Sequence, residues 1–380
     1  MGKNIQIAVY YFPNYHPDAR NALSHGPGWM EWELVRQARP RFAGHRQPRI
    51  PLWGYSDESD PLVMAKKIAA AADHGINAFI FDWYWYNDGP YLERGLEHGF
   101  LGAPNNHRLK FAIMWANHNW IDIHPARYRE CKTNSFTTLY PGAVTRETFE
   151  TAMKHVIHNY FAHPSYWRVD GKPYLSFYDL AEMVRGLGGF QGLRDALTWL
   201  RAEAKAAGHM EIHLNQVFWN QGILPGEQAL RDPNETLGGL GFDSITSYVW
   251  IHHVPLLQFP EVPYTYVCQE YLKFWEATER DVRLPYYPNA SMGWDSSPRT
   301  IQSEAFENVG YPFTPSLSGN TPQNFEAALR QIKTRLEARP SGPKILTVNS
   351  WNEWTEGSYL EPDTVCGMDY LEAIRAVFGR

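Results

Sequence analysis

The chain alternates short apolar runs with longer amphipathic segments along its whole length. The first run, IQIAVYYFP, is followed at 60–75 by apolar residues at the 3.6-residue spacing of a helix that buries one face. Eight runs of this kind predict strands, at 5–13, 76–85, 110–120, 172–179, 211–219, 242–250, 284–294 and 344–351. Helical patterns lie between or after them, at 60–75, 146–162, 192–207, 264–280, 323–338 and 369–379. A repeated order of strand then helix predicts a parallel sheet covered by helices.

Eight strand and helix units predict an α/β fold in which one (β/α)8 barrel, a TIM barrel, fills residues 1–380 as a single domain. A chain of this length can bury a core of that size. The alternative is a doubly wound open sheet. Such sheets usually have fewer strands and often a glycine-rich first turn, and no such turn follows Pro13.

The long irregular stretches lie mostly after the predicted strand ends. They span 14–59, 86–109, 119–145, 218–241 and 295–322. Long loops inside a compact domain are usually functional, and a barrel enzyme has its active site at the carboxyl ends of its strands. The sequence therefore predicts that these βα loops form the active-site face.

Charge and aromatic content restrict the class of ligand. The formal net charge is −6 and no block of like charges occurs, so neither nucleic acid nor an anionic membrane is an expected partner. Aromatic residues make up 15% of the chain, with 15 Trp and 22 Tyr, and many lie next to Asn, Asp or His. That pattern favours a stacking surface for a neutral or mildly polar ligand, such as an oligosaccharide or polysaccharide.

The sequence contains no targeting, redox or cofactor signal. No apolar stretch has the length of a signal-peptide core or the ~20 residues of a membrane span, which predicts a cytoplasmic protein, or a periplasmic or extracellular one if the sequence is trimmed. Cys131, Cys268 and Cys366 are odd in number and widely spaced, so neither a disulfide framework nor a metal site is expected. The neighbours His252 and His253 lack a third ligand at metal spacing and are interpreted as loop residues. Motifs for nucleotide cofactors are absent, so no cofactor is expected, and the oligomeric state is left open.

The segment KILTVNSWNEWTEGSYLEPD places two carboxylates, Glu353 and Glu356, three residues apart beside Trp351 and Trp354. On an extended strand these acids would point to opposite faces, so both can meet one ligand only if the chain curls directly after Ser350. Paired acids at the end of a barrel strand are typical of acid/base catalysis, and exposed tryptophans beside them are typical of a sugar site. The alternative is a surface turn with solvated glutamates.

Polar and aromatic residues also end the other predicted strands. Sugars have weakly apolar C–H faces for stacking and hydroxyls that need fixed donors and acceptors. For single members structural roles remain open: Asp82 as a loop cap, His118 as a buried core histidine. The predicted substrate-binding residues are Tyr11, Asp82, Trp83, Trp85, Trp115, Asn117, His118, Tyr178, Asn215, Tyr248, Trp294, Trp351 and Trp354.

Four motifs, AVYYFPNYHPD, FIFDWYWYNDG, FAIMWANHNW and SWNEWTEGSYLEPD, spread over residues 8–363, resemble glycoside hydrolase family 99-like proteins of the WbsX-like branch, which is associated with lipopolysaccharide and O-antigen. The resemblance implies a (β/α)8 barrel that cleaves α-linked glycans internally with retention of anomeric configuration. Position by position, it implies that Glu353 deprotonates the sugar's own 2-hydroxyl, giving a 1,2-anhydro intermediate, and that Glu356 is the acid and then the base for water. In endo-mannosidases of this family a histidine commonly stands where this chain has Thr355, so a mannose substrate is an extrapolation.

Several alternatives stay open at this point. In ordinary retaining enzymes one acid attacks the anomeric carbon directly, and the sequence does not separate that route from the neighbouring-group route. The WbsX label favours a glycosyltransferase of lipopolysaccharide or O-antigen synthesis, although no doubly wound domain and no Asp-x-Asp metal motif is found. A non-catalytic glycan-binding module is the third reading. Sugar identity, linkage, and endo or exo action are not predicted, and neither are domains that could flank the chain.

Overall fold

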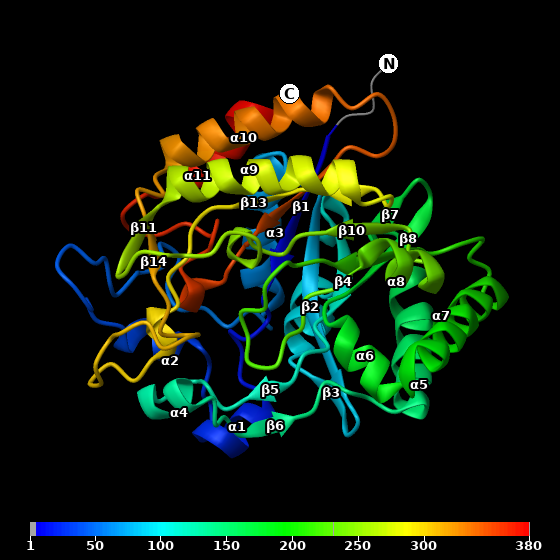
Figure 1. Ribbon diagram of the computed structural model, residues 1–380, viewed down its shortest axis with the longest axis horizontal. Coiled ribbons are helices and arrows are strands. Elements are labelled where there is room, and N and C mark those ends of the chain that lie inside the picture. Colours follow the sequence, from blue (N-terminus) through cyan, green and yellow to red (C-terminus); the bar gives the residue numbers. More distant parts are fainter. Residues whose placement is uncertain (1–4, 231, 380) are drawn as a thin grey trace.

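The computed structural model describes residues 5–230 and 232–379, so residues 1–4, 231 and 380 of the predicted domain lie outside the description. Its centre is a parallel sheet (Figure 1), in which each strand pairs with the next barrel strand along the chain except at one break within residues 286–291. The barrel strands are β1 (Gln6–Tyr11), β2 (Ala78–Tyr86), β4 (Lys110–Trp115), β8 (Lys172–Phe177), β9 (His213–Val217), β10 (Ser244–Thr246), β12 (Tyr286–Tyr287), β13 (Asn289–Ser291) and β15 (Ile345–Asn349).

The sheet closes on itself at the segment 286–291. β12 pairs with β10, β13 pairs with β15, and β15 pairs with β1, all in parallel. Only Pro288, which has no amide hydrogen to donate to a ladder, separates β12 from β13. The two short strands therefore fill one position, and the eight predicted strand positions form a barrel. The predicted α/β barrel fold is confirmed.

Helices cover the outside of the barrel, as predicted from their amphipathic spacing. These are α3 (Pro61–Asp73), α5 (Arg146–Val156), α7 (Gly189–Ala206), α9 (Tyr264–Asp281), α10 (Pro322–Glu337) and α11 (Asp369–Phe378). Two further helices, α6 (Leu180–Gly186) and α8 (Pro233–Leu240), were not predicted, and α8 lies in a stretch expected to be loop. None of the helices in the described part of the chain combines the length and apolarity needed to cross a membrane.

The interior of the barrel is unusually polar for its position. The Thr246 hydroxyl donates to the Tyr287 carbonyl at 2.9 Å, and the Asn289 side-chain amide donates to the Thr347 hydroxyl at 3.2 Å. All of these residues are buried. Other buried polar atoms of the barrel strands, among them Gln216 Oε1 and both side-chain polar atoms of Asn349, have no hydrogen-bond partner among the described residues.

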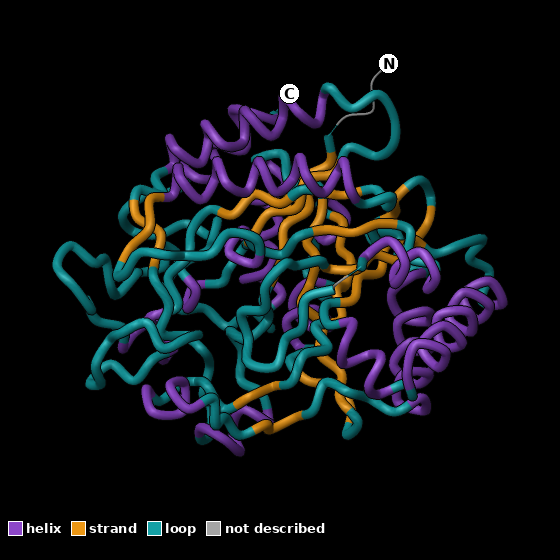
Figure 2. Tube along the Cα trace, in the orientation of Figure 1, coloured by secondary structure: helices purple, strands orange, loops and turns teal. Residues whose placement is uncertain are grey.

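The predicted long loops contain short elements of their own and gather at one end of the barrel. Figure 2 shows them below the strands, at the end away from the two chain termini. They contain α1 (Ala19–His25), α2 (Trp32–Gln37), α4 (Tyr128–Thr133), β3 (Gly89–Tyr91) paired with β2, and a hairpin of β5 (Trp120–Ile121) and β6 (Thr138–Tyr140). Strands β11 (Glu261–Pro263) and β14 (Ser316–Ser318) pair with each other, and β7 (Arg168–Val169) pairs with β8.

Candidate active site

The paired acids lie where β15 ends. The chain leaves the strand at Asn349 and forms a short 3-10 turn at Trp354–Glu356, with Glu353 as the residue before it. The Glu353 amide donates to the Ser350 hydroxyl at 2.9 Å, which holds the start of the turn. This is the curl that the sequence requires for both acids to face one ligand.

Gly357 makes the tight end of this turn possible. Its φ is +62°, a left-handed conformation, and a β-carbon added there would lie 2.7 Å from the Asp295 β-carbon. The Asp295 amide donates to the Glu356 carbonyl at 2.5 Å. A residue with a side chain would therefore face both backbone strain and a clash, so only glycine fits.

The tryptophans and asparagine of the motif anchor it rather than face a ligand. The Asn352 side chain accepts from the Phe12 amide at 2.8 Å and donates to the Phe12 carbonyl at 2.7 Å, joining the ends of β1 and β15. The Trp354 indole donates to Glu361 at 2.9 Å and stacks on Tyr359 with ring centres 3.8 Å apart. Trp351 packs against Phe79, with ring centres 5.0 Å apart.

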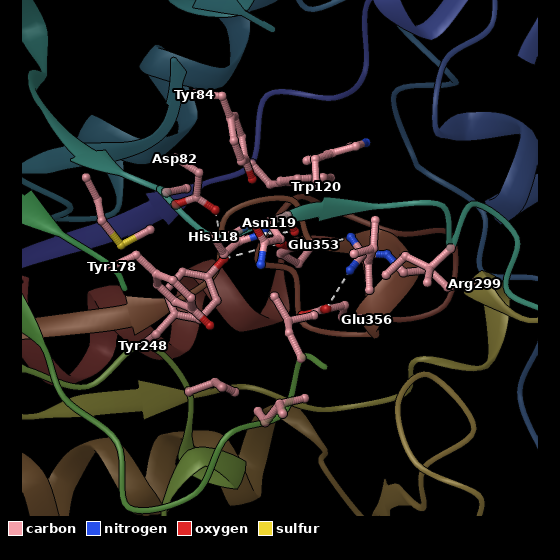
Figure 3. Close-up of a pocket in the computed structure, with 18 of the residues that line it drawn as sticks. Asp82, Tyr84, His118, Asn119, Trp120, Tyr178, Tyr248, Arg299, Glu353 and Glu356 are labelled. Carbon is pink, nitrogen blue, oxygen red and sulfur yellow. Dashed lines mark hydrogen bonds and ion pairs between the residues drawn. The ribbon is translucent and has the colours of Figure 1, made fainter. Parts of the chain in front are cut away.

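Glu353 and Glu356 project into a pocket at the carboxyl end of the barrel (Figure 3). The cavity that the pocket encloses has a volume of about 70 Å³, and its mouth opens to solvent. Its lining combines acids, histidines and aromatic rings with aliphatic side chains. The lining residues are Phe12, Asp82, Tyr84, Met114, Ala116, His118, Asn119, Trp120, Ile121, Ile123, His124, Tyr178, Ile223, Leu224, Tyr248, Val249, His252, Trp294, Arg299, Glu353 and Glu356.

Arg299 lies between the two acids. Its Nη2 is 3.1 Å from Glu353 Oε2, its Nη1 is 2.6 Å from Glu356 Oε1, and its Nε donates to Glu31 at 3.0 Å. The Tyr311 hydroxyl also donates to Glu356 Oε1 at 2.7 Å. The arginine side chain is only 6% exposed. One buried cation therefore pairs with three buried carboxyl groups, Glu31, Glu353 and Glu356.

The protonation of these carboxyls follows from burial and from Arg299. Burial raises the pKa of Glu353 well above its usual value, and the neighbouring Glu356 raises it further while Arg299 opposes the shift. Burial also raises the pKa of Glu356, against Arg299 and the Tyr311 hydrogen bond. For Glu31 burial acts in the same direction, but Arg299 and His124 outweigh it and the pKa is lowered. Glu31 is therefore the ionised partner of Arg299, and the paired acids favour sharing a proton.

Asp82 and Tyr248 continue the polar wall beside Glu353. The Tyr248 hydroxyl lies 2.8 Å from Asp82 Oδ2 and 3.2 Å from Glu353 Oε1. Asp82 Oδ1 is buried and has no hydrogen-bond partner among the described residues. Burial raises the pKa of Asp82 well above its usual value. A buried carboxyl oxygen without a partner at a pocket wall is available to a ligand hydroxyl.

Neutral histidines and aromatic rings complete the lining. The His118 Nδ1 lies 2.9 Å from the Asn119 carbonyl, so Nδ1 carries the hydrogen and Nε2 is an acceptor. Burial lowers the pKa of His118 to about 4 and that of His252 to about 3, so both are neutral near pH 7. The Tyr178 hydroxyl donates to Glu227 at 2.7 Å, and the Trp294 indole donates to Thr314 at 3.0 Å, which fixes both rings at the pocket.

Of the thirteen predicted substrate-binding residues, five line this pocket: Asp82, His118, Tyr178, Tyr248 and Trp294. Eight do not, and alternation along the strands explains several of them. Asp82 points inward, so its neighbours Trp83 and Trp85 point outward, where both rings contact His155 of α5. Trp115 likewise stacks on Phe149 of α5.

The other predicted residues outside the pocket have structural partners. Tyr11 accepts a hydrogen bond from Lys67 of α3 at 3.1 Å. Asn117 donates to the Asp179 carbonyl at 2.7 Å, and Asn215 lies inside the barrel with Ser176 and Ser244. With Trp351 and Trp354, which anchor the acidic turn, these side chains support the barrel wall, and none of them lines this pocket.

Several residues that line the pocket or hold its acids were not predicted. Tyr84 had a usable signal, because it lies two residues after Asp82 on the same strand and must share its face. Glu31, Arg299 and Tyr311 lie in long loops with no periodic pattern, and their convergence comes only from the fold. His252, interpreted as a loop residue, ends the 3-10 turn Trp250–His252 and lines the pocket.

Elsewhere in the described chain, three side chains lie close enough together to hold a metal ion. Potential ligand atoms of Glu93, Glu97 and His155 lie within 4.8 Å of one another. Among the described residues, no other three His, Cys, Asp or Glu side chains come so close together. The Tyr160 hydroxyl already donates to Glu97. In the pocket, Arg299 occupies the place between the acids that a cation would take.

The structure is a (β/α)8 barrel with paired acids in a pocket at the carboxyl ends of its strands. A family model described as "Glycosyltransferase WbsX" matches residues 7–374, and the chain belongs to that family. Two curated relatives, both named "Uncharacterized protein WxcX" and from strains of Xanthomonas campestris pv. campestris, are 28% identical over 98% of this chain. The chain spans about half, 50%, of the length of these relatives.

Solved structures with the same fold include the GH99 endo-alpha-mannosidase from Bacteroides thetaiotaomicron. It has a TM-score of 0.57 and 11% identity, over 98% of this chain and 96% of that chain. A glycoside hydrolase-like protein also has a TM-score of 0.57, with 16% identity over 100% of this chain and 95% of that chain. At these identities the likeness shows a shared fold, and it agrees with the predicted (β/α)8 barrel.

Proposed function

We propose that this protein is a retaining glycoside hydrolase that cleaves α-linked polysaccharides at internal bonds of the glycan. Mannose-containing glycans and O-antigen glycans are the first substrates to test. The observation that carries the proposal is the meeting of Glu353 and Glu356 in one pocket at the carboxyl end of the barrel. Their buried, interacting carboxyls are suited to hold one proton between them, which a retaining acid/base pair needs.

The chemistry assigns a separate task to each acid. Glu353 removes the proton from the sugar 2-hydroxyl as that oxygen attacks the anomeric carbon, and Glu356 gives its proton to the departing oxygen. Water then attacks the anomeric carbon and loses a proton to Glu356, while O2 recovers its proton from Glu353. Two displacements at one carbon return the original anomer. The positive charge of Arg299 stabilises the negative charge of the two acids in a buried site.

The rest of the lining suits a sugar. The rings of Trp120 and Trp294 and the aliphatic side chains offer surface to C–H faces, and Asp82 Oδ1 and His118 Nε2 offer acceptors to hydroxyls. The structural neighbours include a protein named as an endo-alpha-mannosidase, which supports α-linked glycans as the first substrates to test.

The test is hydrolysis by Glu356→Gln, an isosteric change that removes the acid. Loss of general acid catalysis typically costs about 10²- to 10⁴-fold in rate, so turnover on a panel of α-linked oligosaccharides should fall by that factor with folding unchanged. Glu97→Gln, at a partly buried glutamate outside the pocket, is the matched control and should keep wild-type turnover. Full turnover by Glu356→Gln would refute the assignment.

A glycosyltransferase is the second candidate, favoured by the description of the family model. The same pocket would then pass the sugar to a hydroxyl acceptor instead of water. A nucleotide-sugar donor that binds the native protein stabilises it by an amount that grows with the logarithm of the donor concentration divided by its Kd, and so raises the melting temperature. Metal-dependent stabilisation by nucleotide sugars, together with no hydrolysis of any glycan, would favour this candidate. Glycan binding without either reaction would favour a binding module.

A further inference from the structure

Three groups on three elements form a line along one wall of the pocket. Asp82 comes from β2, Tyr248 follows β10, and Glu353 follows β15 (Figure 3). The Tyr248 hydroxyl oxygen is 2.8 Å from Asp82 Oδ2 and 3.2 Å from Glu353 Oε1. All three side chains are buried, at 3%, 7% and 4% exposure.

The hydrogens available to this line can be counted. A tyrosine hydroxyl has one hydrogen, and an ionised carboxylate has none. If Asp82 and Glu353 were both ionised, one of the two short contacts would set oxygen lone pairs against each other in a buried site. Both contacts are hydrogen bonds only when one of the two carboxyls carries a proton and donates it to the Tyr248 oxygen.

The surroundings decide which carboxyl carries that proton. Glu353 Oε2 lies 3.1 Å from Arg299 Nη2, a contact that favours the ionised form and opposes the burial and the neighbouring Glu356 that raise the pKa of Glu353. Asp82 makes no ion pair with a cation in the described chain, and its Oδ1 is buried without a partner. Leaving an ionised oxygen bare in a buried site costs more than leaving a neutral carbonyl oxygen bare.

We propose that Asp82 is the protonated member of this line at neutral pH, that it donates to the Tyr248 oxygen, and that Tyr248 then donates its own hydrogen to an ionised Glu353. Asp82 is thus a positioning residue that acts through Tyr248. Resting on the proposed function, it keeps Glu353 in the ionised form that can accept the proton of a sugar hydroxyl. The other titratable groups facing this line among the described residues are Tyr10, Tyr15, Glu31, Tyr84, Tyr178, His252, Arg299 and Glu356.

Infrared spectroscopy tests the proton's place without any substrate. A protonated carboxyl absorbs apart from carboxylates, and labelling all aspartates with carboxyl ¹³C shifts only aspartic acid bands. In the pH 7 difference spectrum between wild type and Asp82→Asn, one protonated carboxyl band should be lost, and it should move with the aspartate label. Absence of that band would overturn the proposal, and so would a band that moves only with labelled glutamate and is lost in Glu353→Gln.

The pH profile of kcat/KM gives a second readout that a merely structural role would not change. Asparagine also donates from its side chain and is uncharged, so Asp82→Asn should leave the acidic limb, which reports Glu353, in place. If Asp82 were instead ionised, the change would remove a nearby negative charge and move that limb down by about 1 to 3 pH units. Such a downward shift would refute the proposal.

Tyr248→Phe serves as the matched variant for the kinetic readout. It removes the donor to ionised Glu353, so its acidic limb should move to higher pH, because a hydrogen bond to the charged form holds a pKa down. No movement in Tyr248→Phe would contradict the line of donors. If the wild type cleaves no glycan, the proposed function fails, but the infrared measurement still decides where the proton lies.

Discussion

Arg299 is the positive charge on which three buried carboxyls converge, so its replacement tests the electrostatics of the site. In Arg299→Gln the groups Glu31, Glu353 and Glu356 lose their shared partner. Removing one member of a buried ion pair typically costs about 3–5 kcal/mol of stability. We expect a loss of that size at pH 7.

The loss should shrink on acidification, and its sign follows from proton binding. Loss of Arg299 raises the folded-state pKa of at least one of the three carboxyls above the value that it has in the wild type, while the unfolded-state pKa stays at about 4.3. The folded variant therefore binds more protons than the folded wild type. A raised carboxyl pKa gives stability that is present at low pH and is lost as pH rises. For one extra proton the deficit should fall by about 1.4 kcal/mol between pH 7 and pH 6.

Urea unfolding followed by tryptophan fluorescence and by circular dichroism at both pH values measures this, and coincident transitions check two-state behaviour. Arg299→Lys keeps the charge without the guanidinium fork and should be intermediate. Arg330→Gln, at an exposed arginine paired with Glu326, is the control and should stay within about 0.5 kcal/mol of wild type. A deficit at position 299 below about 1 kcal/mol, or one equal at both pH values, would refute the reasoning.

Two further changes test the acidic turn and the loop beside the pocket. Gly357→Ala should lower the free energy of unfolding by at least ~1 kcal/mol more than Gly367→Ala. Both glycines have left-handed backbones, with φ of +62° and +57°, but only a side chain at position 357 would meet a neighbouring atom within 4 Å. Equal melting temperatures of the two variants would contradict this close approach. Burial raises the pKa of Glu227 to about 7, so its contribution to stability should fall as pH rises from about 4.3 to 7, and Glu227→Gln should remove about 1.4 kcal/mol per pH unit of that slope. An unchanged slope in stability between pH 5 and pH 7 would exclude this role.

The order of the barrel could be predicted from the sequence because strand and helix use different periods. The apolar run at 284–294 predicted the position of the seventh strand. It did not predict that Pro288 divides this strand into two short ones. Helix α8 lies within 218–241, a stretch predicted to be loop, and two glycines inside its eight residues weaken the helical pattern. Its ends did show caps: Asp232 accepts from the Glu235 amide, Pro233 follows, and Gly241 closes it in a left-handed conformation.

The candidate site was predictable where local chemistry shows it and not where the fold alone assembles it. The spacing of Glu353 and Glu356 indicated a turn that presents both acids, and the structure contains that turn. Counting Trp83 with Asp82 ignored the alternation that sends neighbouring strand residues to opposite faces. Arg299 lies in a long loop 54 residues before Glu353, and no local pattern links the two.

Product anomers test the central claim most directly. Wild type and Glu356→Gln would be incubated with α-linked oligosaccharides and O-antigen polysaccharides, and the first product signals would be followed by proton NMR before mutarotation. Release of the α-anomer by the wild type, with turnover lower by about 10²-fold or more in the variant, is the predicted result. Initial release of the inverted anomer, or no cleavage of any glycan by the wild type, would contradict a retaining hydrolase built on Glu353 and Glu356.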